Sequence, residues 1–245
     1  MTTLFSINFN KIALLRNSRG RDYPSVQSFA RRAVELGVGG LTLHPRPDQR
    51  HARYSDVFDL KALCLEFPGT ELNIEGYPTS KFLDIVIEAQ ADQCTLVPDA
   101  PDQITSDHGW DIQKNGDMLK PIIKRLQREG IRVSLFMDPD PEQIELVKST
   151  GTDRIELYTE EYADSFHTDQ CKPVLEKYEK AATHAHSLGL GVNAGHDLNL
   201  ENLARFLTID GIKEVSIGHA VIVESLLMGF DNVVRQYLEI VKQKG

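Results

Sequence analysis

The stretch GIRVSLFMDPDPEQIELVKSTGTDRIELY, residues 130–158, holds two short apolar runs on either side of an amphipathic segment. The runs at 133–138 and 154–158 have the length of buried strands. Between them, the tetrapeptide DPEQ at 140–143 offers a helix N-cap, a proline in the first turn and a glutamine at the capping-box position. Gly151 then offers a stop. The stretch therefore predicts a strand–helix–strand unit with parallel strands and a right-handed crossover.

The same unit recurs along the chain, with no linker or low-complexity segment between repeats. In the segment 26–34 the apolar residues follow helical spacing, and Gly37 is a natural stop. Eight units in 245 residues predict an α/β fold, a closed (β/α)8 TIM barrel formed as one domain by residues 1–245. A doubly wound open sheet is the alternative. The predicted strands are Leu4–Phe9, Leu41–Pro45, Leu72–Gly76, Cys94–Pro98, Val133–Asp138, Arg154–Tyr158, Gly191–Ala194 and Glu214–Ile217.

The composition is that of an ordinary globular protein, with 41% hydrophobic and 26% charged residues. No uncharged apolar run approaches the roughly 18 residues of a membrane span. The start, MTTLFSINFN, lacks the basic region of a signal peptide. The three cysteines are widely spaced and form no CxxC pair, which argues against a disulfide scaffold or a zinc ribbon. We expect a soluble cytoplasmic protein that does not bind membranes.

The charge is unevenly distributed. The whole chain carries −9, which argues against general nucleic-acid binding, because phosphate neutralisation needs a basic surface. Through residue 53, however, nine Lys and Arg residues stand against three acids, a balance of +6. A local concentration of cations on an acidic protein suits small anionic ligands. A solvated basic face is the alternative.

In a (β/α)8 barrel, functional groups lie where the strands end and the βα loops begin. Polar residues stand at those ends in this chain, and several interrupt otherwise apolar runs. The opposite strand ends carry Gly, Asp and Lys without a pattern. One rim is therefore predicted to hold the functional groups: Asn8, Asn10, His44, Arg46, Glu75, Asp99, Asp138, Glu156, Asn193, His196, Gly218 and His219.

Two rim positions suit proton transfer beside a bound phosphate. The loop LTLHPRPDQRH, residues 41–51, places two histidines and two arginines together. Glu75 ends the third strand, where partial desolvation would raise its pKa toward that of a useful base. The alternatives are a loop whose cations pair with nearby acids, and an ion pair between Glu75 and a rim arginine.

The last two rim loops suit phosphate binding. His196 lies on a glycine turn after the seventh strand, and Gly218-His219 follows the eighth, where the first amides of the next helix could bind an anion. His108, His167, His184 and His186 are expected in loops or on helix faces, without a role. His44, His51, Glu75 and His196 are possible metal ligands, but no His-x-His or HExxH motif supports a metal and the nearby arginines would repel one. No GxGxxG or GxxxxGK[ST] motif supports a nucleotide cofactor.

Seven segments in order resemble the pyridoxine 5′-phosphate synthase family of vitamin B6 biosynthesis. They are INFNKIALLRNSRG, LTLHPRPDQRH, LNIEG, LVPDAPDQITSDHGWD, RIELY, VNAGHDL and SIGHA. The resemblance covers nearly the whole chain and implies a (β/α)8 barrel with additional short helices. It also implies a transferase-type ring-closing synthase, which condenses 1-deoxy-D-xylulose 5-phosphate with 3-amino-2-oxopropyl phosphate and releases phosphate and water. Neither a metal nor an organic cofactor is implied, and the partners are the two phosphorylated substrates and further copies of the chain, in a homooctamer built as a tetramer of dimers.

The resemblance also implies roles for particular residues, position by position. His44 and Glu75 match the general bases, His196 the proton donor, and Glu156 a carboxylate that stabilises developing charge. The aminoketone phosphate site matches Asn8, Arg19, Gly218 and His219, and the sugar-phosphate site matches Arg46, His51 and Thr105.

The chain departs from the commoner family pattern at three places. Asn10-Lys11 stands where Asp-His is common, and both positions belong to the sugar-phosphate site, where Lys11 could serve as a phosphate cation. Asp197 replaces a glycine that often follows the active histidine, so a backbone contact to substrate there could change. Pro45 and Pro47 flank Arg46 and stiffen its loop. Two other functions remain open at this point: a non-catalytic sugar-phosphate-binding relative, and a metal-dependent sugar isomerase or hydrolase.

Overall fold

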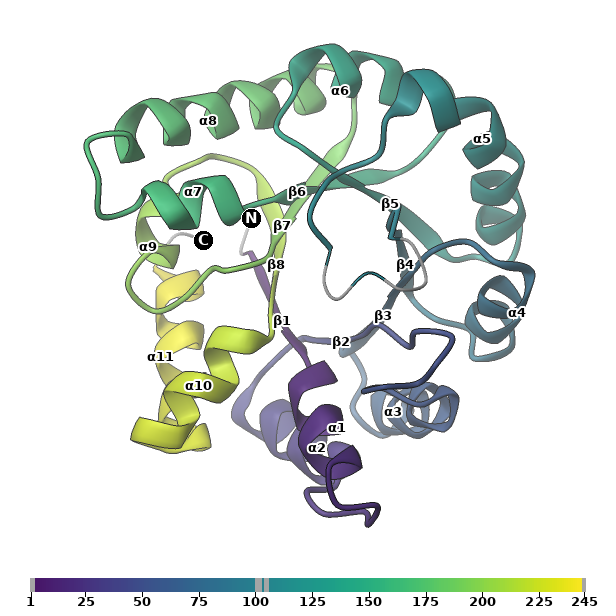
Figure 1. Cartoon of the computed structure of the whole chain (residues 1–245), viewed down its shortest axis with the longest axis vertical. Coiled ribbons are helices and arrows are strands. Elements are labelled where there is room, and N and C mark those ends of the chain that lie inside the picture. The colour runs from purple at the N-terminus through teal and green to yellow at the C-terminus, as the bar shows by residue number, and fades with distance from the viewer. Residues whose placement is uncertain (1–2, 100–102, 104–105, 244–245) are drawn as a thin grey trace.

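Eight parallel strands close into a barrel in the order in which they occur along the chain, and helices surround them (Figure 1). The computed structural model describes residues 3–99, 103 and 106–243. The closed barrel confirms the predicted (β/α)8 fold, and the alternative prediction of an open doubly wound sheet is wrong. The strands are β1 Leu4–Asn8, β2 Gly40–Leu43, β3 Glu71–Gly76, β4 Gln93–Leu96, β5 Arg132–Met137, β6 Arg154–Tyr158, β7 Gly191–Gly195 and β8 Ile212–Ile217.

Helices follow the strands and cover the outside of the barrel. The short helices α1, α7 and α9 stand beside longer ones, as the family resemblance implies. The helices are α1 Asn10–Asn17, α2 Val26–Leu36, α3 Tyr54–Glu66, α4 Ser80–Glu88, α5 Ile112–Arg128, α6 Pro141–Val147, the 3-10 turn η1 Lys148–Thr150, α7 Glu160–Ser165, α8 Cys171–Ser187, α9 Leu203–Phe206, α10 His219–Met228 and α11 Phe230–Lys242. None of these helices is both long enough and apolar enough to cross a membrane.

Each predicted strand overlaps an observed one, with ends that differ by at most two residues. The predictions for β2 and β4 run too far, to Pro45 and Pro98. A proline has no N–H to contribute to the ladder, so both strands end before it. The predicted helix over 26–34 is α2, and Gly37 ends it in the left-handed conformation at φ 107°.

Asp140 caps α6 as predicted, because its carboxylate accepts a hydrogen bond from the Glu142 amide at 2.9 Å. Gln143 does not complete the capping box. Its side-chain oxygen instead accepts a hydrogen bond from the Ile112 amide at 2.8 Å, at the start of α5. The side chain therefore joins the N-termini of two neighbouring helices.

The apolar core lies between the barrel and the helices, and the barrel interior is polar. Phe5 of β1, for example, points outward and stacks on Tyr237 of α11, with ring centroids 5.1 Å apart. Inward-facing positions carry hydroxyl, amide and carboxyl groups, where barrels more commonly hold branched aliphatic residues. These buried polar residues are Ser6, Thr42, Asn73, Gln93, Thr95, Ser134, Glu156, Asn193, Glu214 and Ser216.

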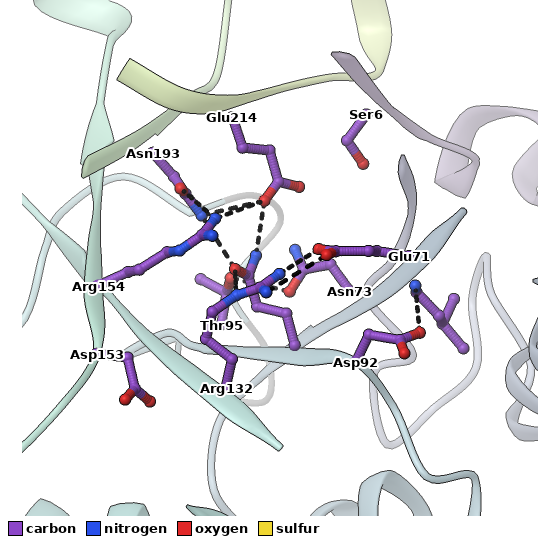
Figure 2. Close-up of polar contacts among 12 residues, drawn as sticks. Ser6, Glu71, Asn73, Asp92, Thr95, Arg132, Asp153, Arg154, Asn193 and Glu214 are labelled. Atoms are coloured by element: carbon purple, nitrogen blue, oxygen red, sulfur yellow. Dashed lines mark hydrogen bonds and ion pairs between the residues drawn. The ribbon is translucent and has the colours of Figure 1, made fainter. Parts of the chain in front are cut away.

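At the amino-terminal end of the strands, six residues form a connected cluster that we call the base network: Glu71, Gln93, Arg132, Arg154, Asn193 and Glu214 (Figure 2). Glu214 accepts hydrogen bonds from Gln93 at 3.0 Å and Asn193 at 3.2 Å. Arg154 lies 3.6 Å from the same carboxylate. These charges are therefore compensated inside the fold.

Candidate active site

The polar residues at the carboxyl ends of the strands meet around one cavity of about 430 Å³ in the barrel mouth. The structure therefore brings most of the predicted site residues together. Those that line the cavity are Asn8, Asn10, Lys11, His44, Arg46, His51, Glu75, Glu156, His196, Asp197, Gly218 and His219.

Five predicted residues are not among them. Asn193 lies in the middle of β7 rather than at its end and belongs to the base network, Asp99 pairs with Arg46, and Asp138 lines a separate cavity. Arg19 is exposed on the turn after α1 and does not line the cavity. Thr105 lies outside the described residues.

Five further residues line the cavity that were not predicted from the sequence: Val97, Ser106, Phe136, Glu160 and Ser216. Ser216 carried a signal, because a polar residue interrupts the apolar end of its strand. Phe136 of β5 and Val97, directly after β4, are apolar residues at strand ends and look like core residues in the sequence.

The start of α1 connects three strand ends. The Asn8 side chain accepts a hydrogen bond from the Asn10 amide at 3.0 Å and donates one to the Glu75 carboxylate at 3.2 Å. The Asn10 side chain accepts a hydrogen bond from the His44 amide, also at 3.0 Å. Lys11 lines the cavity and forms no ion pair with another described residue. The two asparagines therefore position the predicted bases, and Lys11 brings a positive charge to the mouth.

The end of α1 holds the loop at 46–53. Arg16 is 2% exposed and forms an ion pair with Asp56 at 2.5 Å, and it also donates to the His51 carbonyl at 3.3 Å. Asn17 donates to the same carbonyl at 2.7 Å. Because loop carbonyls accept these bonds from a rigid helix, His51 is held in one place at the mouth.

Both histidines of this loop are neutral near pH 7. Burial lowers the pKa of His44 well below its usual value, and the charges of Arg46, His51 and Arg50 lower it further. Burial and Arg46 also lower the pKa of His51, to about 4. His51 Nδ1 accepts a hydrogen bond from the Ala52 amide at 2.9 Å, which leaves the proton of neutral His51 on Nε2. His44 can therefore accept a proton, and His51 can donate a hydrogen bond to an anion.

Both arginines of the loop pair with acids, as the alternative interpretation of this loop expected. Arg50 contacts Asp48 at 2.8 Å, and Arg46 contacts Asp99 at 2.5 Å in a buried pair that Ser106 joins through a bond to Asp99. Arg46 Nε and Asp99 Oδ1 are buried without a hydrogen-bond partner among the described residues. Unsatisfied buried polar atoms are rare, so this ion pair has unused hydrogen-bonding capacity beside the mouth.

Glu75 has no cationic partner within hydrogen-bond or ion-pair distance among the described residues, so the alternative interpretation, an ion pair with a rim arginine, is wrong. Among the described residues, Asn8 is its one hydrogen-bond donor, at 3.2 Å. Burial and the nearby Glu156, Glu214 and Asp99 raise the pKa of Glu75 well above the usual carboxyl value. This agrees with the desolvated base expected from the sequence.

Glu156 lies at the bottom of the cavity and is 4% exposed. Thr95 is its hydrogen-bond donor at 3.3 Å. Burial, and then the charge of Glu214, raise the pKa of Glu156 to about 8. A Cβ atom at Gly195 of the neighbouring strand β7 would collide with the Glu156 carboxylate, so a larger residue there would displace that carboxylate.

Gly218 and His219 form the uncapped N-terminus of α10 at the cavity wall. No side chain caps this helix, and its first amides have no intrahelical acceptor. The helix dipole adds partial positive charge at the same end. The arrangement can bind a phosphate, as predicted for the loop after the eighth strand.

Among the described residues, no three His, Cys, Asp or Glu side chains are grouped as metal ligands. A second cavity of about 670 Å³ lies beside α7 and α8, and its lining includes Asp138, Glu161 and Lys177. Of the predicted rim residues, only Asp138 lines that cavity, whereas the predicted general bases His44 and Glu75 line the cavity in the barrel mouth.

Comparisons with known proteins agree with this geometry. Residues 5–243 match the family model described as "Pyridoxal phosphate biosynthesis protein PdxJ". The chain is 52% identical over 241 residues to the pyridoxine 5′-phosphate synthase of Flavobacterium johnsoniae, covering 98% of this chain and 100% of the relative. It is 49% identical to that of Porphyromonas gingivalis, covering 96% and 97%.

Solved structures with low sequence identity share the fold. One is 3-keto-L-gulonate-6-phosphate decarboxylase from Vibrio cholerae, with a TM-score of 0.68, 11% identity and full coverage of both chains. Another is 3-hexulose-6-phosphate synthase from Salmonella typhimurium, with a TM-score of 0.66, 13% identity and full coverage of both. At this identity the likeness concerns the barrel alone.

Proposed function

The chain belongs to the family of the pyridoxal phosphate biosynthesis protein PdxJ, and on that premise we propose how its barrel mouth makes pyridoxine 5′-phosphate. The substrates are 1-deoxy-D-xylulose 5-phosphate and 3-amino-2-oxopropyl phosphate. The amine adds to the ketone and loses water to form an imine; elimination of phosphate and an aldol ring closure with further loss of water follow. Every stage moves protons beside a carbonyl or an imine.

Two separate anion sites hold the two phosphates. The N-terminus of α10, with Gly218, His219 and the adjoining Asn8, takes the aminoketone phosphate. Arg46 and the neutral Nε2–H of His51 take the sugar phosphate, with Lys11 as an additional cation at the rim. Residues of both sites line the same cavity, which brings the amine of one substrate to the ketone of the other.

The bases lie between these sites. Neutral His44 and the ionised form of Glu75 accept protons as the amine adds and as the carbon atoms lose hydrogen. Glu156 lies beneath the reacting atoms, where a cationic imine would favour its ionised form and be stabilised by it. His196 donates the proton that the departing hydroxyl needs. His44, Glu75 and Glu156 thus have shifted pKa values and line one cavity, which is typical of sites that carry out acid–base chemistry.

The observation that carries this proposal is that a neutral buried histidine, His44, and a carboxylate without a cationic partner among the described residues, Glu75, line the same cavity. Lys11, Arg46 and the N-terminus of α10 line that cavity too. A non-catalytic sugar-phosphate-binding protein would need these anion-binding groups but not the bases. A metal-dependent isomerase or hydrolase would need three convergent ligands, and the described residues contain no such group. Lys11 and Arg46, which line the mouth, would also repel a metal cation.

The test is incubation of purified protein with both substrates, with mass-spectrometric detection of pyridoxine 5′-phosphate and an assay for released phosphate. We expect both products only when both substrates are present, and unchanged rates with a strong chelator. His44→Gln should abolish product formation, whereas His184→Gln, on the outer helix α8, should not. Phosphate binding without product would support the non-catalytic alternative, and loss of activity with chelator would support the metal-dependent one.

We further propose that the chain forms homo-oligomers through the surface of α1 and α10, which pack side by side (Figure 1). This surface exposes large apolar side chains: Leu14, Leu15, Val223, Leu226, Leu227 and Met228. Exposed apolar groups gathered on one face are typical of an interface between subunits. Light scattering should give the octamer implied by the family, and Leu227→Glu should reduce the assembly.

The compartment that we propose is the cytoplasm. Cys64, Cys94 and Cys171 are all buried and unpaired. Free buried thiols fit a reducing environment. Fractionation of cells that make the untagged protein tests this proposal, since recovery with the membranes or outside the cell would contradict it.

A further inference from the structure

The turn that carries His196 has an unusual backbone. His196 and the next residue, Asp197, both adopt positive φ, at 87° and 58°. Two other non-glycine residues in the described part of the chain, Gln49 and Gln90, also do so, but neither is adjacent to another such residue. Left-handed backbone is costly for residues with a Cβ and persists where the surroundings enforce it. Both residues line the cavity, so this strain lies in the candidate site.

Buried side chains hold the turn in place. The Thr159 hydroxyl donates to the carbonyls of Gly195, at 2.8 Å, and of His196. Asn202 donates to the Asp197 carbonyl at 3.1 Å. Thr159 is fully buried and Asn202 is 1% exposed. The fold therefore fixes the backbone on both sides of His196, and a glycine at 197 would adopt this conformation at lower cost.

The side chain of Asp197 is directed at the imidazole. Its Oδ2 lies 2.7 Å from His196 Nδ1. No lysine or arginine among the described residues pairs with this carboxylate. On the other side, the Tyr158 ring packs edge-on against His196, with centroids 5.0 Å apart. The imidazole is thus held by a carboxylate at one nitrogen and by an aromatic ring across its plane.

We propose that Asp197 is a positioning residue for His196: it fixes the Nδ1–H tautomer and the ring orientation, so that Nε2 serves the substrate. The inference deepens the role of His196 as proton donor proposed above and rests on it. A carboxylate can only accept from Nδ1, so the proton on that nitrogen is retained. The imidazolium then donates from Nε2 and becomes the neutral Nδ1–H form, with no proton transferred to Asp197.

The surrounding charges agree with an ionised Asp197. The hydrogen bond from His196 lowers the pKa of Asp197, and the charges of His196, His219 and Lys11 act in the same direction. Tyr158, whose ring packs on the imidazole, donates its hydroxyl hydrogen to Glu160. Asp197 is therefore the group that supplies negative charge directly to His196.

The first arm of the test measures catalysis in Asp197→Gly and Asp197→Asn. The glycine variant keeps the turn without strain, and the asparagine variant keeps the size of the side chain. We expect kcat to fall about ten- to a hundredfold in both, with KM for both substrates within about threefold. The loss should be smaller than the ~10⁴ of a fully buried aspartate–histidine pair, because Asp197 is partly exposed. Asp210→Asn, an exposed carboxylate at the opposite end of the barrel, should leave both parameters unchanged.

The second arm reads the tautomer directly by ¹⁵N NMR of histidine-labelled protein, with the His196 signals assigned by His196→Gln. Neutral His196 should carry its proton on Nδ1 in the unsubstituted protein and on Nε2 in Asp197→Gly. Wild-type kcat in Asp197→Gly, or the same tautomer in both proteins, would overturn the proposal. Because this spectrum needs no turnover, it separates failure of the positioning role from failure of the proposed synthase activity.

Discussion

Both ends of the barrel interior hold buried carboxylates, but these differ in how many hydrogen-bond and ion-pair partners they have. At the base, Glu214 accepts hydrogen bonds from Gln93 and Asn193 and lies 3.6 Å from Arg154 (Figure 2). At the mouth, Glu75 accepts one bond, from the neutral Asn8. Both carboxyl groups have raised pKa values, chiefly through burial. The charges of Arg154 and Arg132 oppose that rise at Glu214, whereas at Glu75 the charge of Arg46 opposes it and three further carboxyl groups, Glu156, Glu214 and Asp99, increase it.

The contrast separates carboxylates that stabilise the barrel from carboxylates that are available for chemistry. A buried charge with matched donors fixes a register between strands, and removing one partner exposes the other to a large desolvation cost. A buried carboxyl group without a nearby cation is costly to ionise. Its pKa is therefore raised, and its ionised form is a stronger base. Substitutions at the mouth should therefore change rate, and those at the base should change stability.

The largest expected effect is that of Glu75→Gln on turnover. The amide keeps the size and the bond to Asn8 but cannot accept a proton. General-base removal typically costs about 10²–10⁴-fold in kcat. Because the pKa of Glu75 is raised, the acid limb of the wild-type rate profile should lie above the ordinary carboxyl range and should disappear in the variant.

Steady-state kinetics from pH 5 to pH 9 check this prediction, and circular dichroism checks that the variant folds. Substrate affinity should change little, because phosphate binding uses other residues. Turnover within a few-fold of wild type would mean that Glu75 is only a hydrogen-bond partner of Asn8.

Next comes Arg154→Met at the base. The substitution keeps the length of the side chain and removes the cation from Asn193 and Glu214. We expect a loss of about 2–4 kcal/mol in the free energy of unfolding, since one partner of a buried pair is left behind. Urea denaturation measures it. Lys172→Met breaks an exposed pair on α8 and should cost at most about 0.5 kcal/mol.

The kinetic constants of folded Arg154→Met should stay within about twofold of wild type, because the base network does not touch the cavity. A catalytic defect without a loss of stability would contradict the division between base and mouth.

A third prediction concerns Glu156→Gln, which should make the protein more stable at alkaline pH. The pKa of Glu156 is raised to about 8 in the folded state, above its unfolded value, so the folded state binds this proton more tightly. That contribution is complete at low pH and is lost as the pH rises through about 8. The glutamine side chain does not ionise, so the variant keeps this contribution at high pH. We expect its free energy of unfolding at pH 9 to exceed that of wild type by roughly 1–3 kcal/mol.

Denaturant titrations at pH 5 and pH 9 measure the difference. The gain should be small at pH 5 and should grow toward pH 9, whereas Glu239→Gln, exposed on α11, should show no such trend. A gain that is the same at both pH values would show that Glu156 is ionised throughout.

The smallest effect expected is that of Lys11→Ala. Lys11 is exposed at the rim, so its bond to the sugar phosphate should be worth the lower end of the ~1.5–3 kcal/mol of a charge-assisted hydrogen bond, or roughly tenfold in Kd. Calorimetric titration with each substrate separately should show weakening for the sugar phosphate only. Lys124→Ala on α5 serves as the control, and equal weakening of both substrates would contradict the assignment.

Most of the mouth could be predicted from the sequence, because strand ends are visible in it. His44, Glu75, His196 and Gly218 each follow an apolar run, and barrel geometry then places them on one rim. Glu160 and Ser106 could not be found, since their positions depend on how loops return to the mouth. The pairing of Arg46 with Asp99 joins residues 53 positions apart and carried no local signal.

The sequence by itself determined the eight strand–helix units, their parallel direction and the rim that carries the functional groups, because these follow from periodicity, caps and stops along the chain. Tertiary structure decided which charges are compensated. Glu214 and Glu75 look alike in the sequence, and only closure of the barrel gives one of them two amide donors and a nearby arginine and the other a single asparagine. The physical reason is that burial and neighbouring charge act through space, and they come from strands that are far apart in the chain.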